Sequence, residues 1–215
     1  MPVEYEVKKS DSDQVEVSRL RGEFAEYFAR KYYAEKGVAL TKIVYPIGQS
    51  DSSVEPEREA IELGTGIKVK SEKKTALFSQ PELKINPRLE GMLTWALSDE
   101  YGEKKAKVKV KKIITLITPK TKLSGNEGYY DDAVGLPDYI HASREHGIFF
   151  VEVKSGKNPF NENQKKTFKR ILDAGFKIEL IRFRFEEDCS RCGKRHFKIK
   201  KEPEEVRPIT EADLR

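Results

Sequence analysis

The chain has 215 residues, of which 36% are charged, 37% hydrophobic and 10% aromatic, and its formal net charge is +5. This length and apolar content suit one elaborated domain or two small ones and exclude wholesale disorder. No stretch approaches the ~20 apolar residues that span a bilayer, and the first residues lack a signal-peptide pattern, so we expect a soluble cytoplasmic protein. The abundance of Lys and Glu is a bias reported for hyperthermophile proteins.

The charge is unevenly distributed along the chain. The first eighteen residues carry a net charge of −3 and the last fifteen one of −2, which leaves +10 on residues 19–200. A basic body favours a polyanionic partner, most commonly nucleic acid, although a solvated thermophile surface has the same composition. We expect residues 201–215 to form a mobile acidic tail.

The first half of the chain shows two helical patterns. Aromatic residues recur at helical spacing over residues 18–36 and predict a first helix. Residues 38–47 have the character of a strand. Asn86, which precedes a proline, predicts the start of a second helix that ends before Gly102.

A lysine-rich segment follows the second helix. Six lysines lie within residues 104–112 and run into β-branched residues. Their alternation predicts a strand with four lysines on one face, where they would follow a phosphate backbone. The alternative is an exposed strand whose lysines prevent edge-to-edge association. The four lysines are Lys105, Lys107, Lys109 and Lys111.

The second half of the chain predicts a strand–helix–strand unit. The segments GLPDYIHA and IFFVEVK have the patterns of two strands, and a helix over residues 162–174 precedes the strand FKIELIRFRF. A connection of this length implies a right-handed crossover between parallel strands. We therefore expect an α/β or α+β fold with a mixed sheet.

Two charged residues interrupt an apolar strand in IFFVEVK. Glu152 and Lys154 share one face of this strand with Phe150. An exposed ion pair at the strand end would explain them. The other explanation is that Asp138, which opens the preceding strand, brings a second carboxylate beside Glu152. Two adjacent carboxylates favour a hard cation such as Mg²⁺ or Mn²⁺, with Lys154 beside the attacking water.

Two short motifs match a known pattern. The residues GLPD at 135–138 precede EVK at 152–154, and Gln164 and the helix-ending Gly175 follow in order. This set resembles the PD-(D/E)XK nuclease superfamily, and within it the VRR-NUC branch and the archaeal Holliday-junction resolvases. The resemblance covers residues 135–183 well and the first helix loosely.

The resemblance implies a restriction-endonuclease-like fold, a mixed β-sheet flanked by helices. Asp138 and Glu152 would bind Mg²⁺ or Mn²⁺, aided by the carbonyl of Val153, and Lys154 would act on the attacking water. The implied activity is metal-dependent hydrolysis of DNA phosphodiester bonds, structure-selective for branched, flapped or broken DNA in repair, recombination or replication, by a homodimer. The alternatives are a sequence-specific restriction endonuclease and a DNA- or protein-binding factor that keeps the fold without catalysis.

The superfamily also places a glutamate of the first helix at the metal. Glu26 follows Gly22 by four residues, as in resolvase-like members. We therefore expect Glu26 at the metal, with Glu23 as its substitute. A solvated helix face is the alternative for either residue.

The start of the later helix carries two further candidates. Gln164 either faces the active site, as the resemblance implies, or completes a capping box with Asn161. Lys157 lies in the loop before this helix, where a phosphate would meet the helix N-terminus.

Residues 48–128 have no counterpart in the motifs that carry the resemblance. Residues 1–47 and 129–186 would form the nuclease core. Residues 48–128 exceed the short connection of compact members, so we expect an inserted α+β subdomain that clamps DNA or forms a dimer interface.

The chain has two cysteines, both near its C-terminal end. Cys189 and Cys192 form a C-x-x-C pair within an expected hairpin over residues 187–200. A zinc site would need His196 and a further donor, such as Asp188 or a second subunit. A disulfide or free thiols are the alternatives.

Overall fold

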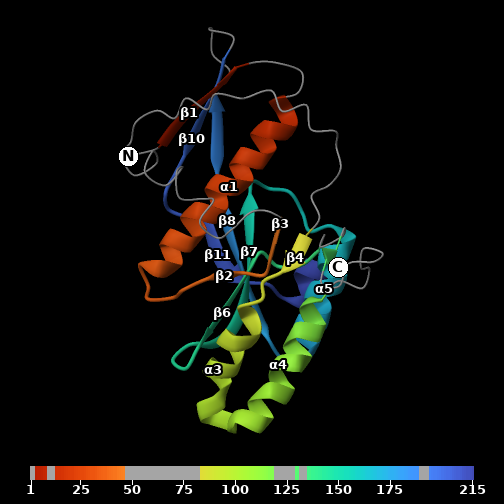
Figure 1. Ribbon diagram of the computed structural model, residues 1–215. Coiled ribbons are helices and arrows are strands. Elements are labelled where there is room, and N and C mark those ends of the chain that lie inside the picture. The colour runs from red at the N-terminus through yellow and green to blue at the C-terminus, as the bar shows by residue number, and fades with distance from the viewer. Residues whose placement is uncertain (1–2, 9–12, 47–82, 119–128, 131–134, 189–193) are drawn as a thin grey trace.

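The computed structural model describes residues 3–8, 13–46, 83–118, 129–130, 135–188 and 194–215. The centre of the molecule is a five-stranded mixed sheet in the order β11-β8-β7-β6-β2 (Figure 1). β7 and β8 are parallel and the other neighbours antiparallel, so the predicted parallel pair is confirmed. The strands are β2 (Thr41–Lys42), β6 (Tyr139–Ser143), β7 (Gly147–Ser155), β8 (Lys177–Phe183) and β11 (Glu205–Pro208).

Two smaller sheets accompany the central one. The first has the order β1-β10-β9 and the second the order β3-β4-β5. Both are antiparallel throughout. Their strands are β1 (Val3–Lys8), β9 (Phe185–Asp188), β10 (Lys194–Ile199), β3 (Val44–Pro46), β4 (Leu83–Ile85) and β5 (Tyr129–Tyr130).

Helix α1 (Asp13–Ala34) covers one face of the central sheet, which confirms the first predicted helix (Figure 1). Its aromatic side chains form a core with residues that alternate along β7 and β8, because successive strand residues face opposite sides. Phe28 packs against Phe183 with a ring-centroid distance of 6.1 Å. Val151 of β7 and Ile181 of β8 also belong to this core.

Three helices cover the opposite face: α3 (Leu89–Tyr101), α4 (Glu103–Ile117) and α5 (Glu162–Asp173). Their buried side chains share one core with Phe150, Ile140 and other strand residues. Helices α3 and α4, which lie within residues 48–128, therefore pack into the same core as the central sheet. Within the described residues no helix is long and apolar enough to cross a membrane.

The lysine-rich segment forms a helix, so the predicted lysine strand is wrong. The buried residues of α4 are Ala106, Val110, Ile113 and Ile117, which recur at helical spacing. This apolar stripe outweighs the alternation of Lys and Val, and Val108 is left 59% exposed. Residues two positions apart do not share a helix face, so the four lysines cannot form a single row.

The end of the chain is part of the fold, contrary to the prediction of a mobile acidic tail. Strand β11 pairs with the edge strand β8, and Ile209 is 3% exposed. Arg207 makes two contacts to the carboxylate of Asp213, of 2.7 and 2.8 Å, and it holds the pKa of that carboxyl at about 2. The pairing with the sheet anchors residues 205–214.

Candidate active site

The paired strands β6 and β7 bring the two motifs together. The Val153 N–H donates a hydrogen bond of 2.7 Å to Oδ2 of Asp138. Phe150 lies in the core beneath α3, α4 and α5, whereas Val151 lies in the core beneath α1. The predicted division of the strand into two faces is therefore confirmed, and Glu152 follows Phe150 toward α5.

Glu152 is the centre of a buried polar cluster. It is 2% exposed, and Nε2 of Gln164 donates to its Oε1 over 2.6 Å. The Lys154 Nζ lies 3.2 Å from the same Oε1 and donates to Oε1 of Gln164 over 3.1 Å. The other carboxylate oxygen of Glu152, Oε2, is buried and has no hydrogen-bond partner among the described residues. An unsatisfied buried carboxylate oxygen is unfavourable unless another group, such as a cation, fills the site.

Gln164 completes the predicted capping box and also contacts Glu152. Its backbone N–H donates to Oδ1 of Asn161 over 2.8 Å, and its Oε1 accepts from the Asn161 N–H over 3.1 Å. This is a complete capping box at the start of α5. The side-chain Nε2 of Gln164 donates to Glu152, so the residue that caps α5 also holds the carboxylate of Glu152 in place.

The two carboxyl groups resist ionisation. Burial, and then the charge of Asp138, raise the pKa of Glu152 well above its ordinary value, while Lys154 and Gln164 act in the opposite direction. Burial, and then the charge of Glu26, raise the pKa of Asp138 to about 7, although the hydrogen bond from Val153 lowers it. A protonated or cation-bound pair relieves this repulsion.

Glu26 lies near the pair but is held by other residues. Its Oε2 is 2.5 Å from Nζ of Lys42 and accepts a hydrogen bond of 2.9 Å from Tyr139. The charge of Glu26 acts on Asp138, so the two carboxyl groups lie in the same neighbourhood. Across the described residues, no group of three His, Cys, Asp or Glu side chains is arranged as a ready metal site. Glu23, the alternative, has a partner of its own.

Gly135 allows the first motif to approach α5 closely. Its φ is +106°, and a Cβ at this position would lie 2.6 Å from the backbone carbon of Asn163. Only glycine combines this backbone conformation with so close an approach. The G of the motif therefore sets the distance between the Asp138 loop and the start of α5.

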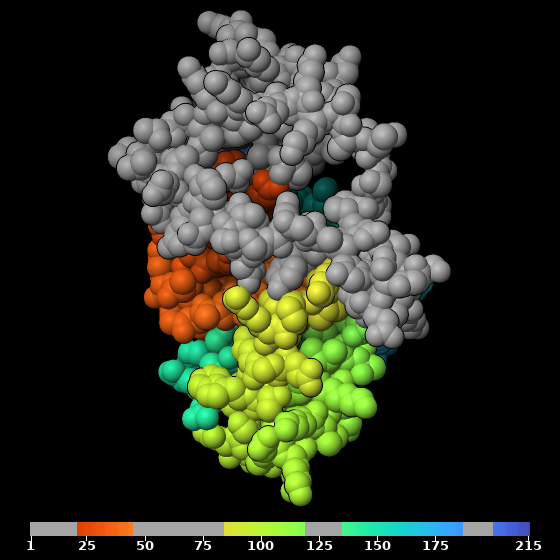
Figure 2. All heavy atoms as spheres, in the orientation of Figure 1, coloured from red at the N-terminus to blue at the C-terminus, as the bar shows by residue number. Residues whose placement is uncertain are grey.

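Lys157 and the six lysines of α4 are exposed. Lys157 lies in the loop before α5. Figure 2 shows α3 and α4 side by side on one face of the molecule. Lys107 pairs with Glu103 at 2.7 Å, and Nζ of Lys109 lies 3.2 Å from the ring centre of Tyr101. Cys189, Cys192 and the side chain of His196 lie outside the described residues.

Sequence reasoning missed Lys42 and Tyr139. Tyr139 directly follows Asp138, which gave a usable signal, but an aromatic residue in a strand is normally interpreted as core. Lys42 is visible only through strand pairing, because it stands opposite Tyr139 in the β2–β6 register.

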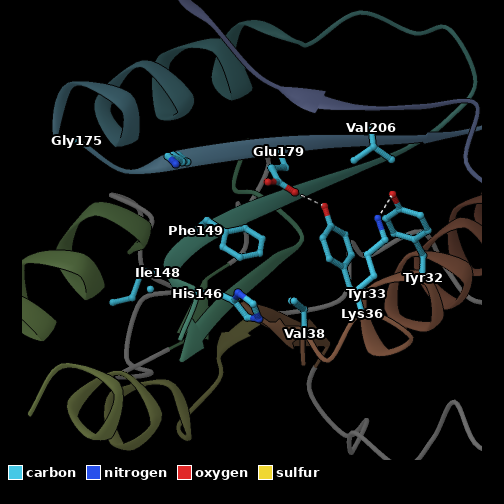
Figure 3. A pocket seen from close by; sticks show the side chains of 12 residues that line it. Tyr32, Tyr33, Lys36, Val38, His146, Ile148, Phe149, Gly175, Glu179 and Val206 are labelled. Atoms are coloured by element: carbon cyan, nitrogen blue, oxygen red, sulfur yellow. Dashed lines mark hydrogen bonds between the residues drawn. The ribbon is translucent and has the colours of Figure 1, made fainter. Parts of the chain in front are cut away.

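A separate pocket of about 590 Å³ lies at the opposite end of β7. Figure 3 shows residues from the end of α1 facing Phe149, Glu179 and Val206 of the sheet. Tyr33 donates a hydrogen bond of 2.6 Å to Glu179 across this pocket. It contains neither Asp138 nor Glu152 and is a distinct hollow.

Comparisons with protein-family models, with curated proteins and with solved structures found no match. Two carboxyl groups, Asp138 and Glu152, ionise unfavourably. Among the described residues one buried oxygen of Glu152 is unsatisfied, and the ammonium of Lys154 lies beside the other oxygen.

Proposed function

We propose that this protein is a metal-dependent DNA nuclease with a restriction-endonuclease-like core. The observation that carries the proposal is the unpartnered Oε2 of Glu152, which is buried beside Asp138 while Lys154 and Gln164 hold the other oxygen. The order of these residues in the sequence is that of the PD-(D/E)XK superfamily. Together they supply the donor atoms and the ammonium that hydrolysis of a phosphodiester requires.

The donor set fits a hard divalent cation. Carboxylate oxygens are the ligands that Mg²⁺ and Mn²⁺ prefer, and two of them suffice because these ions keep several waters. Asp138 and the free oxygen of Glu152 would hold the ion, with the carbonyl of Val153 as a further ligand. When bound, the ion would polarise the scissile phosphate and favour deprotonation of water.

The other residues of the cluster have defined tasks in this proposal. Gln164 holds Oε1 of Glu152, which leaves Oε2 for the cation. Lys154 is fixed between Glu152 and Gln164, and its side chain is 16% exposed, so its ammonium reaches the site with little freedom. A fixed ammonium stabilises the negative charge that develops on a phosphate under attack.

The basic surfaces would hold the DNA. Lys157 is exposed next to the N-terminus of α5, where a phosphate is favoured. Helix α4 carries six lysines and one acidic residue and presents several of them to solvent. We propose a homodimer that acts on branched, flapped or broken DNA in repair, recombination or replication. Zinc at Cys189 and Cys192 remains an expectation from the sequence.

A panel of DNA substrates tests this proposal. Linear, flapped and four-way DNA would be incubated with Mg²⁺, Mn²⁺ or EDTA, and the products separated on sequencing gels. Metal-dependent cleavage near junctions or flaps supports the proposed function. Cleavage at one sequence in linear DNA would indicate a restriction endonuclease instead. DNA binding without cleavage under any metal condition would indicate a non-catalytic binding factor.

A further inference from the structure

The carboxylate of Glu26 is held by two residues that stand opposite each other in the central sheet. Lys42 of β2 and Tyr139 of β6 are register partners. The Lys42 Nζ lies 2.5 Å from Oε2 of Glu26, and the Tyr139 hydroxyl donates to the same oxygen over 2.9 Å. One oxygen of Glu26 therefore receives both an ammonium and a phenol.

These three residues lie on the α1 side of the sheet. Tyr139 belongs to the core beneath α1, whereas Ile43, the neighbour of Lys42, belongs to the core on the opposite face. Because side chains alternate along a strand, Lys42 points to the α1 side with Tyr139. Glu152 faces α5 instead, where Gln164 contacts it. Glu26 and Glu152 thus approach Asp138 from different sides.

The backbone of Lys42 is firmly placed. Its carbonyl accepts a hydrogen bond of 3.0 Å from Nδ2 of Asn86, a residue that is 1% exposed. The adjacent Ile43 N–H donates to the carbonyl of Asp138 over 3.1 Å. The backbone of Lys42 and Ile43 is therefore tied to Asp138, which directly precedes β6, so the ammonium of Lys42 can leave Glu26 only through a change in its own side-chain conformation.

The charged residues around the site form two ion pairs and leave one carboxyl group, that of Asp138, without an ion-pair partner in this cluster. Lys154 pairs with Glu152, and Lys42 pairs with Glu26. Asp138 has no ammonium of its own within this arrangement, although the charges of both lysines act on it. A divalent ion at Asp138 and Glu152 would more than neutralise the single remaining negative charge. A second ion at Glu26 would meet the ammonium of Lys42 at contact distance, and like charges so close repel strongly.

We infer that Lys42 is a positioning residue that takes the place of a second cation: it keeps Glu26 on the α1 side and restricts the site to one divalent ion. This inference rests on the proposed function. It also departs from the expectation that Glu26 binds the metal, because Glu26 then acts only through its pair with Lys42.

The number of bound Mn²⁺ ions tests the inference without any measurement of activity. Free Mn²⁺ would be measured by electron paramagnetic resonance during titration of the 215-residue protein, which gives the number of bound ions. Wild type and the matched control Lys42→Arg should each bind one Mn²⁺ tightly. Lys42→Met releases Glu26 and should bind two. The double variant Lys42→Met, Glu26→Gln should return to one. Anomalous diffraction from Mn²⁺-soaked crystals of wild type would locate the ion.

The outcomes separate this inference from the proposed function. One ion on Asp138 and Glu152, with Glu26 still on Lys42, supports both. Two tight ions in wild type, or Glu26 as a ligand there, would overturn the role of Lys42 and leave the proposed function standing. An unchanged count of one in a folded Lys42→Met variant would overturn it as well. Binding of no Mn²⁺ at all would overturn the proposed function and the inference with it.

Discussion

Lys154 and Glu152, two residues apart on β7, form an ion pair of 3.2 Å whose side chains are only 16% and 3% exposed. A buried pair of this kind adds little net stability, yet removal of one partner leaves an uncompensated charge. The pair is thus poorly explained as a device for stability. Because the pair lies beside Asp138, it is better explained as part of a charged functional site.

Lys154→Met should therefore destabilise the fold strongly. The loss should be about 3 kcal/mol, toward the lower end for a broken buried pair because Glu152 can take up a proton. The double variant Lys154→Met, Glu152→Gln should regain part of this loss, since no charge is left behind. Urea denaturation of the two variants and wild type measures the difference. Equal losses in the single and double variants would contradict the account.

The two roles of Gln164 can be separated by substitution. Asn161→Ala removes only the cap of α5 and should lower the free energy of unfolding by about 1 kcal/mol. Gln164→Ala removes the cap and also the hydrogen bond to Glu152, so it should further weaken Mn²⁺ binding about tenfold or more. Denaturation and calorimetric Mn²⁺ titration give the two readouts. Similar Mn²⁺ affinities in both variants would show that Gln164 serves the helix alone.

The metal-free protein should lose stability as the pH rises. The folded state keeps a proton on Asp138 up to about pH 7, whereas the unfolded chain releases it near the ordinary value of 3.8. Between these values the folded state binds more protons, so the free energy of unfolding falls with pH, by at most about 4 kcal/mol for this group.

Denaturation in EDTA from pH 5 to pH 8 would show this slope. It should disappear in the double variant Asp138→Asn, Glu152→Gln, which has no raised carboxyl pKa in the site. Saturating Mg²⁺ should also reduce the slope in wild type, because the ion competes with the proton. A slope that survives the double substitution must arise elsewhere and would refute this assignment.

Two glycines provide a matched test of the motif geometry. Gly135 and Gly147 both have positive φ, of +106° and +70°, but only at Gly135 would a Cβ collide with the backbone of Asn163. Gly147→Ala should cost about 1 kcal/mol through backbone strain alone. Gly135→Ala should cost clearly more and also weaken Mn²⁺ binding, because it displaces the Asp138 loop from α5. If the two variants behave alike, the close approach is unimportant.

The sequence was most informative where one periodicity prevailed. The β7–α5–β8 unit was predictable because its strands are apolar, its helix has a capping box, and Gly175 closes it. Asp138, Glu152 and Lys154 were found through the order of the motifs, and the structure brings these three together with Gln164.

Other elements were hidden by overlapping patterns. In α4 the alternation of Lys and Val imitates a strand. The buried stripe that reveals the helix runs from Ala106 to Ile117, and apart from Ala106 it consists of β-branched residues, which have low helix propensity. Strand β11 is masked by the net negative charge of residues 201–215, and its ladder with β8, which stabilises it, is not visible in the local sequence. The Lys42–Glu26 contact depends on the β2–β6 register, which no local pattern encodes.

The most direct test of the central claim is the rate of DNA cleavage as a function of Mg²⁺ concentration for wild type, Asp138→Asn and Lys154→Met. Wild type should cleave with saturable dependence on Mg²⁺ and not at all in EDTA. Both variants should lose about 100-fold or more in rate while still binding DNA. Cleavage by wild type in EDTA, or full activity in folded Asp138→Asn, would contradict the account.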